Sequence, residues 1–474
     1  MRLLTRVLLA YALLGLLAGC GGAPAPTVAL TATATTSAPT KPAEIPRATV
    51  PAPLATPPDP ASPRAIMGMD LRGALLGTRS LSYAPAAGAV WARFQVSWRD
   101  IQPQAGDPPA YQWDAYDEWL GKLAGAGLRV IATVRNNPSW ASSTACGPLN
   151  AAGQAAFPSF LTALVSRYAQ PPYNVKHWEL YNEPDNADPV NYPELGGCWG
   201  KDAAGYAALL QSAYAAIKAA DPTAIVIFGG IALEKFDGSP FNVDFLKQAL
   251  QAGAGSYFDW MAFHYYPAFS YRWDRYGHGV EGKAAYVRQV MKDAGVDKPV
   301  TCSEIGQPSA GPASEGYSQE KQSALLIQQH AQAILAKMPF AIWYCLQDIS
   351  GDQRAYGLLS AGGKPKPAYA TYQRLALALN AARFERLLSP AEAGSDKIEA
   401  YLFQQPAGER KALLLAWRRD AGAALPLPIP ANSARLTSSA GAQTMVSDGG
   451  AGDMNPAAGA LSVGVGPDPL IIEY

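Results

Sequence analysis

The sequence predicts a closed (β/α)8 barrel followed by a small β-sandwich domain. Between residues 65 and 379 of the 474-residue chain, short runs rich in β-branched and aromatic residues alternate with helix-length segments. After residue 379 the helical spacing stops and short alternating runs take over. Repeated strand–helix units build a parallel sheet, and eight units in a segment of this length fit a barrel.

Each barrel element follows from its own pattern. The first strand is the weakest, because the first strand–helix unit is poorly patterned and contains Pro85. An open doubly wound sheet is the alternative, but no G-x-G-x-x-G motif follows the first strand. The expected strands are Ala65–Asp70, Val90–Val96, Leu128–Val134, Lys176–Tyr181, Ala224–Phe228, Phe258–Phe263, Pro299–Ser303 and Phe340–Tyr344. The expected helices are Asp114–Ala126, Gly153–Tyr168, Ala203–Ala219, Val243–Ala252, Gly282–Ala294, Gln319–Lys337 and Pro367–Leu379.

The domain at residues 380–474 is expected to be a β-sandwich. Segments such as Ile398–Gln404, Ala412–Trp417 and Leu461–Val465 are apolar or alternating and are separated by Gly, Pro and Asp turns. Nothing in this domain suggests chemistry.

The chain begins with a predicted signal peptide at residues 1–19. Arg2 and Arg6 precede an apolar run that is too short to span a bilayer. Leu17-Ala18-Gly19-Cys20 resembles the lipobox of bacterial lipoproteins, which implies that Cys20 carries the lipid. Residues 20–64 are rich in Pro, Ala and Thr and predict a disordered tether. We therefore expect an extracytoplasmic protein anchored to the bacterial cell membrane by lipid.

The amino-acid composition indicates which classes of ligand and partner the protein can bind. Lys plus Arg (38) balance Asp plus Glu (38), so no overall field attracts nucleic acid. An aromatic share of 10% with 16% charged residues suits stacking on neutral sugars, although composition alone favours a large aromatic core as the explanation. We expect a monomer without metal or cofactor, since no Cys/His group has zinc-ligand spacing.

The four remaining cysteines fall into two groups. Cys146 and Cys198 lie in Gly- and Pro-rich loop sequence, where a disulfide is expected in an oxidising compartment. Cys302 and Cys345 lie in apolar runs and are expected to be buried thiols.

Two glutamates stand where a barrel carries its chemistry, at the carboxyl ends of strands. Glu183 follows the fourth expected strand and Glu304 follows the seventh. These strands face each other across a barrel mouth. Hydrolysis of a glycosidic bond needs one carboxyl group to protonate the leaving oxygen and another to attack the anomeric carbon or activate water.

The motifs around these glutamates resemble those of clan A glycoside hydrolases, families 5 and 39. The resemblance rests on Asn182-Glu183-Pro184 and Glu304, and extends over the barrel through Arg93, Trp98–Pro103, Pro138-Ser139-Trp140, His264-Tyr265-Tyr266 and Trp343. It implies a retaining glycosidase that acts on polysaccharides or oligosaccharides, with Glu183 as acid/base and Glu304 as nucleophile.

The resemblance also implies supporting roles. Arg93 and Tyr266 would hydrogen-bond Glu304, Asn182 would hold a sugar 2-hydroxyl, and Trp343 would form the floor of the reactive subsite. A carboxylate beside Arg and Tyr stays ionised, whereas an acid that faces it without a cation is held protonated. Further candidates for substrate binding or support are His264, Asn137 and Trp140.

Several alternatives stay open on the sequence alone. Arg93 pairs either with Glu304 or with Glu179 inside the barrel, and either Tyr265 or Tyr266 faces the site. His264 is a core residue in the other interpretation, and Trp98, Trp140, Trp199 and Trp273 either pack in the core or bind sugar. A catalytically silent sugar-binding lipoprotein of the same fold is the rival function, but such a protein has no need of a proton donor opposite a nucleophile.

Overall fold

The computed structural model describes residues 58–72, 79–188, 199–234, 239–267, 273, 275–311, 316–352, 354–406, 410–455, 457 and 459–474. All of these residues belong to one compact unit, Val50–Tyr474. The expected signal peptide, Cys20, most of the expected tether and Cys198 lie outside the described residues.

The folded body begins earlier than the expected boundary after residue 64. Ser62 is buried, and its hydroxyl donates to the carbonyl oxygens of Leu379 and Asn380 at 2.8 Å each. Arg64 is also buried and donates from Nε to the carbonyl of Gly88 at 2.9 Å. A short polar segment is thus ordered by hydrogen bonds to the barrel, which its Pro-rich composition does not reveal.

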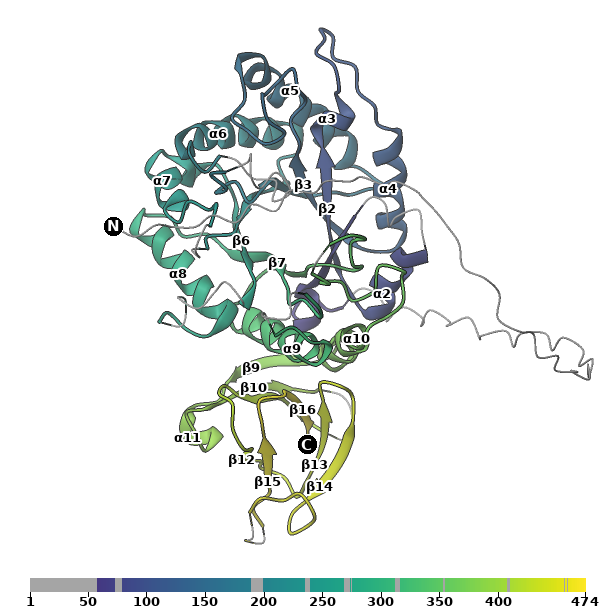
Figure 1. Cartoon of the computed structure of the whole chain (residues 1–474), viewed down its shortest axis with the longest axis vertical. Helices are drawn as coiled ribbons and strands as arrows, with labels where there is room; N and C mark the ends of the chain where they lie inside the picture. The colour runs from purple at the N-terminus through teal and green to yellow at the C-terminus, as the bar shows by residue number, and fades with distance from the viewer. Residues whose placement is uncertain are drawn as a thin grey trace, which may run out of the picture. The chain divides into compact units, whose positions relative to one another are not determined.

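Eight parallel strands form a closed barrel, as predicted (Figure 1). Neighbours in the chain are neighbours in the sheet, and β1 closes the ring by pairing with β8. The strands are β1 (Met67–Leu71), β2 (Trp91–Ser97), β3 (Arg129–Arg135), β4 (His177–Asn182), β5 (Ile225–Ile231), β6 (Trp260–Tyr265), β7 (Val300–Ile305) and β8 (Ala341–Trp343).

Helices surround the strands, as Figure 1 shows. Their starts are set by capping side chains: Asn150 accepts from the Gly153 N–H, Asp202 from Gly205 and Ser318 from Lys321. Proline at the first turn opens the last barrel helix. The helices are α2 (Tyr83–Ala87), α3 (Trp98–Ile101), α4 (Asp114–Gly125), α5 (Ala151–Tyr168), α6 (Ala203–Ala220), α7 (Phe245–Gln251), α8 (Gly279–Asp293), α9 (Gln319–Leu335) and α10 (Pro367–Leu379).

The barrel interior is apolar at one end and charged at the other. Trp91, Ile131, Ile227, Phe340 and Ile342 form a closed apolar cluster inside the ring. Side chains alternate along a strand, so the residues two or four positions further on also point inward, nearer the carboxyl ends. That is where the chain places its polar groups.

The C-terminal domain is a separate antiparallel structure, as predicted. A six-stranded sheet in the order β14-β13-β16-β11-β10-β9 accompanies the two-stranded β12-β15 sheet, and an apolar cluster lies within this domain. Thr371 of α10 donates to the carbonyl of Ser439 at 2.8 Å. The strands are β9 (Arg383–Leu387), β10 (Ile398–Gln404), β11 (Ala412–Arg418), β12 (Leu425–Pro428), β13 (Ser433–Ser438), β14 (Gln443–Ser447), β15 (Ser462–Val465) and β16 (Leu470–Glu473).

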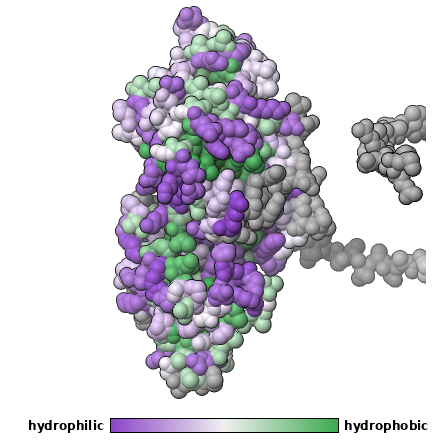
Figure 2. Space-filling model, turned by 90° about the vertical axis from the view of Figure 1, so that its left-hand side faces the viewer, coloured by the Kyte–Doolittle hydropathy of each residue, from purple (hydrophilic) through white to green (hydrophobic). Residues whose placement is uncertain are grey.

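The surface is mixed in character. On the face shown in Figure 2, hydrophilic side chains alternate with hydrophobic patches. Within the described ranges, the large hydrophobic side chains that are exposed are Leu377, Leu387, Met445 and Met454. In the same ranges no helix is long and apolar enough to cross a bilayer.

Candidate active site

Glu183 and Glu304 meet at the carboxyl ends of β4 and β7. Glu183 follows the last residue of β4, and Glu304 is the penultimate residue of β7. One oxygen of each carboxyl group and one ring nitrogen of His264 all lie within 4.8 Å of one another. The two glutamates are 7% and 6% exposed, so a small part of each faces outward. The strand-end pattern therefore located both carboxyl groups in one site.

Glu304 is held by two donors. Arg93 Nη1 donates to Oε1 at 2.6 Å, and the Tyr266 hydroxyl donates to Oε2 at 2.5 Å. Burial raises the pKa of Tyr266 well above its usual value, so this hydroxyl keeps its proton. Tyr266, rather than Tyr265, thus faces the site. Charge-assisted hydrogen bonds of this kind stabilise a carboxylate.

Arg93 joins the site to the barrel interior. Its Nε donates to Glu179 at 2.7 Å, Nη1 also reaches Asp70 at 3.2 Å, and Nη2 donates to Asn182 Oδ1 at 2.6 Å. The arginine is fully buried. Burial by itself would lower the Arg93 pKa, but three carboxylates outweigh it and raise the value. Both partners expected for Arg93 are therefore present at once.

Asp70, on β1, was not among the sequence candidates. Its pKa is raised to about 6, mainly by burial, with Arg93 acting in the opposite direction. The signal was available in the sequence, because a lone aspartate near the end of an apolar strand sits at the same level as other site residues. The weak pattern of the first unit hid it.

His264 contacts both glutamates. Its Nδ1 is 3.0 Å from Glu183 Oε1 and 3.5 Å from Glu304 Oε2. Burial, together with the Arg93 charge, lowers the His264 pKa well below its usual value, so the ring is neutral. In the tautomer that carries its proton on Nδ1, it donates to Glu183. His264 therefore lies beside both glutamates, and its expected supporting role stays a prediction.

The backbone is strained where β4 ends. Tyr181 has φ +66° and Glu183 has φ +46°, a region that costs residues other than glycine about 1–3 kcal/mol each. The Glu183 N–H donates to the carbonyl of Gly230 at 2.8 Å. Strain of this kind persists only where surrounding contacts determine the backbone, and here it turns the Glu183 carboxyl group toward Glu304.

Asp185 supplies one of those contacts. This buried carboxylate accepts the backbone N–H groups of Ala232 and Leu233 at 3.1 and 2.7 Å, which ties the segment after β4 to the segment after β5. Its pKa is raised to about 6, mainly by burial. Nothing in the sequence distinguished Asp185 from a solvated loop aspartate.

The environment favours a protonated Glu183. Burial raises its pKa well above the usual value, and the charges of Glu304 and Asp185 add to this effect, while the charges of Arg93 and Arg135 oppose it. In contrast to Glu304, which binds a guanidinium, Glu183 contacts the neutral ring of His264. The two carboxyl groups therefore differ in their surroundings: Glu304 accepts from a guanidinium and a hydroxyl, whereas Glu183 contacts a neutral ring.

Trp343 is not in the site, which corrects the expectation that it forms the floor of the reactive subsite. Its side chain is fully buried outside the ring, stacked on His330 of α9 with 6.4 Å between ring centroids. Ile342 points inward, so alternation sends Trp343 outward and Tyr344 inward. Tyr344 lies beside Tyr266, with ring centroids 6.3 Å apart.

Asn137 and Trp140 organise the loop after β3. Asn137 Oδ1 accepts from the Tyr181 hydroxyl at 2.6 Å, and its N–H donates to Ala145. Trp140 is half-buried and packs edge-on against Trp98. Trp98, Trp199 and Trp273 are all buried in the apolar core, so the packing interpretation holds for them.

The cysteines divide as expected within the described residues. Cys146 is disulfide-bonded, while Cys302 and Cys345 are buried free thiols. Cys198, the expected partner of Cys146, lies outside the described residues.

Glu183, His264 and Glu304 have the spacing of a three-ligand metal site among the described residues. The Arg93 guanidinium, 2.6 Å from Glu304, places a fixed positive charge where a cation would bind. These three side chains are thus better suited to acid–base or nucleophilic reactions of the carboxyl groups than to binding a metal ion.

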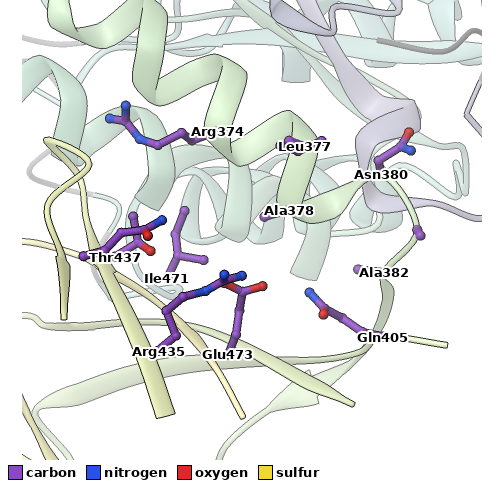
Figure 3. A pocket seen from close by; sticks show the side chains of 12 residues that line it. Arg374, Leu377, Ala378, Asn380, Ala382, Gln405, Arg435, Thr437, Ile471 and Glu473 are labelled. Carbon is purple, nitrogen blue, oxygen red and sulfur yellow. The ribbon is translucent and has the colours of Figure 1, made fainter. Parts of the chain in front are cut away.

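A separate cavity of about 330 Å³ lies between α10 and the C-terminal sheet (Figure 3). Its charged groups have partners in the protein. Arg435 Nε donates to Glu473 at 2.8 Å, and Arg374 Nη2 donates to the carbonyl of Ser439 at 2.6 Å. None of the residues that line this cavity belongs to the carboxylate site.

Comparisons with known proteins agree with this geometry. The family model described as "Cellulase (glycosyl hydrolase family 5)" matches residues 80–343. No curated protein sequence matches the chain.

Solved structures share the fold at low identity. A family 39 glycoside hydrolase from Bacteroides cellulosilyticus WH2 has a TM-score of 0.64 and 18% identity, over 88% of this chain and 81% of that one. A monomeric β-xylosidase from Caulobacter crescentus CB15 has a TM-score of 0.59 and 16% identity, over 86% and 95%. A family 30 endoxylanase from Clostridium papyrosolvens C71 has a TM-score of 0.55 and 12% identity, over 86% and 96%.

Proposed function

Because the chain belongs to the cellulase family, glycosyl hydrolase family 5, we propose that it cleaves β-glycosidic bonds of polysaccharides or oligosaccharides with retention of configuration. Glu183 is the acid/base and Glu304 the nucleophile. The observation that carries the proposal is the close approach of the two carboxyl groups, with oxygens within 4.8 Å. Retaining enzymes hold this pair ~5–5.5 Å apart, whereas inverting enzymes leave ~6.5–9.5 Å for a water molecule.

In the first step, the Glu304 carboxylate attacks the anomeric carbon and the bond to the leaving oxygen breaks. Glu183 gives its proton to that oxygen as the sugar fragment departs. The Arg93 and Tyr266 donors hold the Glu304 carboxyl group in position for this attack, and the neutral His264 ring leaves the proton on Glu183. A covalent glycosyl ester on Glu304 results.

In the second step, Glu183, now a carboxylate, accepts a proton from water, and the water oxygen attacks the anomeric carbon. The ester bond to Glu304 breaks and the site returns to its starting protonation. Two inversions give net retention. The bound sugar lies against the ring of Tyr344 rather than that of Trp343.

Alanine variants separate the two roles. Aryl β-xylosides and xylan are the first substrates, because two of the structural neighbours are named as a β-xylosidase and an endoxylanase. Glu183→Ala should lose activity on poor leaving groups, retain glycosylation by activated aryl glycosides, and turn over faster with azide. Glu304→Ala should form no covalent intermediate and yield an azide product of inverted configuration with azide. Glu118→Ala, an exposed carboxylate on α4, is the matched control.

Two outcomes contradict the assignment. If azide gives a retained product with Glu304→Ala and an inverted one with Glu183→Ala, the roles are reversed. If wild-type protein binds oligosaccharides tightly but cleaves none in a broad panel, the sugar-binding lipoprotein is the better description.

We further propose that Cys20 anchors the protein to the membrane, outside the cytoplasm. The support is the Leu-Ala-Gly-Cys box and its Pro/Thr-rich sequel. Cys20→Ser should move the protein from the membrane to the soluble fraction. Retention of this variant on membranes after a salt wash would contradict the anchor.

A further inference from the structure

Two arginines other than Arg93 point toward the carboxyl end of the barrel. On β3, Ile131 belongs to the inner apolar cluster and Thr133 donates to Glu179 at 2.6 Å, so alternation directs Arg135 inward at the mouth. On β1, Asp70 faces Arg93, and the next inward position is Arg72. Both arginines thus lie nearer the mouth of the barrel than the buried carboxyl groups of Glu179 and Asp70.

Arg135 has no protein partner among the described residues. None of its nitrogens takes part in a hydrogen bond or ion pair there, and its Nε is buried. The charges that act on it are those of Arg93, Glu304, Glu183 and Asp70, which all belong to the site. A guanidinium carries five N–H donors, and each one buried without an acceptor costs about 1–3 kcal/mol.

Arg72 is only partly satisfied. Nη2 donates to the Tyr344 hydroxyl at 2.5 Å, while its buried Nε lacks a partner among the described residues. Arg93 provides the contrast, since every nitrogen of its guanidinium has an acceptor. Every nitrogen of the Arg93 guanidinium therefore has an acceptor, whereas Arg72 and Arg135 each keep N–H donors without an acceptor among the described residues.

We propose that Arg135, assisted by Arg72, binds the carboxylate of a uronic acid residue in the substrate. The inference rests on the proposed glycosidase function and names its substrate class: an acidic polysaccharide or oligosaccharide. The planar guanidinium fork matches a carboxylate with two parallel hydrogen bonds, whereas a neutral sugar hydroxyl offers one acceptor at a time.

The electrostatics of the site require such a receptor if the substrate is acidic. Glu304 and Asp70 would repel an anionic sugar, and Arg93 is already occupied by both. Only additional positive charge at the mouth makes the approach of a uronate favourable. Arg135 and Arg72 supply that charge from two different strands.

The kinetic test compares glucuronoxylan with the same polymer after its carboxyl groups have been reduced to alcohols. Wild type should cleave the native polymer with a KM about 10- to 100-fold lower, the range expected of hydrogen bonds to a charged group. Arg135→Gln should lose this preference, because glutamine cannot offer a carboxylate the two charge-assisted hydrogen bonds of a guanidinium. Arg129→Gln, at the opposite and exposed end of β3, is the matched control and should retain the preference.

Stability separates a receptor from a structural arginine. Removing a buried charge without a partner should leave the Tm of Arg135→Gln unchanged or raised, whereas loss of a structural ion pair would lower it. Equal cleavage of both polymers by wild type, or an equal loss on both by Arg135→Gln, overturns the inference. A preference for sulfated over uronate polymers also overturns it.

A binding measurement distinguishes this inference from the proposed function. Glucuronate, galacturonate and mannuronate are titrated against the full-length chain by calorimetry, with the corresponding neutral hexoses as controls. Binding of a uronate that Arg135→Gln abolishes, without hydrolysis of any glycoside, keeps the inference and removes the glycosidase. Hydrolysis of neutral glycosides, with no uronate bound, keeps the glycosidase and removes the inference.

Discussion

Arg93 on β2 donates from Nη1 to Glu304 Oε1 on β7 across 2.6 Å, and the same guanidinium binds Glu179 and Asp70. One buried cation thus contacts three carboxyl groups from three other strands. Removing one member of such a group is costly, because the remaining buried charges lose their partner.

Arg93→Met should therefore lower the free energy of unfolding by about 3–5 kcal/mol, the cost of breaking a buried ion pair from one side. Arg93→Lys keeps the positive charge but loses the planar guanidinium and its several N–H donors. Relative to wild type, its stability should therefore fall less than its activity. Urea denaturation and kcat/KM on an aryl glycoside measure the two effects. A folded Arg93→Met protein with wild-type stability would contradict the network.

The pH profile should depend on Asp185. Its negative charge helps to hold the proton on Glu183, so Asp185→Asn should lower the Glu183 pKa. The alkaline limb of kcat/KM, which reports loss of the acid's proton, should then move to lower pH. Glu118→Gln on α4 is the control, and an alkaline limb that does not move in Asp185→Asn counts against the coupling.

The same pKa can be followed without turnover. In Glu304→Gln the other negative neighbour is removed, so the Glu183 carboxyl group should also titrate at lower pH by carbon NMR. The NMR titration of Glu183 in Glu304→Gln can still be measured if Asp185→Asn folds poorly. A Glu183 titration that rises or stays in place would show that burial alone sets it.

Gly230 should not tolerate a side chain. A Cβ at this position would lie 2.3 Å from both His264 Nε2 and Ser303 Oγ, well inside contact distance. Gly230→Ala should displace His264 from Glu183, lower kcat and cost about 1–3 kcal/mol of stability. Gly125→Ala, at the exposed end of α4 with nothing within 4 Å, should be neutral or slightly stabilising.

Trp343 and Tyr344 should respond differently to mutation. Trp343→Ala removes a fully buried side chain and should cost about 3–5 kcal/mol of stability. Tyr344→Ala removes a partly exposed ring at the mouth and should raise KM more than it lowers the Tm. If Trp343→Ala raises KM without loss of stability, the assignment of the two rings is wrong.

Local sequence patterns are enough to predict the barrel and the position of its two glutamates. Strand and helix periods are local, and the carboxyl ends of parallel strands meet at one face, so Glu183 and Glu304 could be placed together without coordinates. The choice between Arg93 partners could not be made, because Glu179 and Glu304 lie on different strands. The structure shows that the guanidinium binds both.

Which of two neighbouring residues faces inward, and which polar groups find partners, depends on how the strands and loops come together in three dimensions. A shift of one residue along a strand moves every side chain to the opposite face. The expected position of Trp343 at the mouth of the barrel is therefore held by its neighbour Tyr344. Asp70, Asp185 and Arg135 resemble ordinary polar residues in sequence. Their roles depend on contacts between segments far apart in the chain, and on whether burial leaves a charge paired or unpaired, and neither is encoded in local pattern.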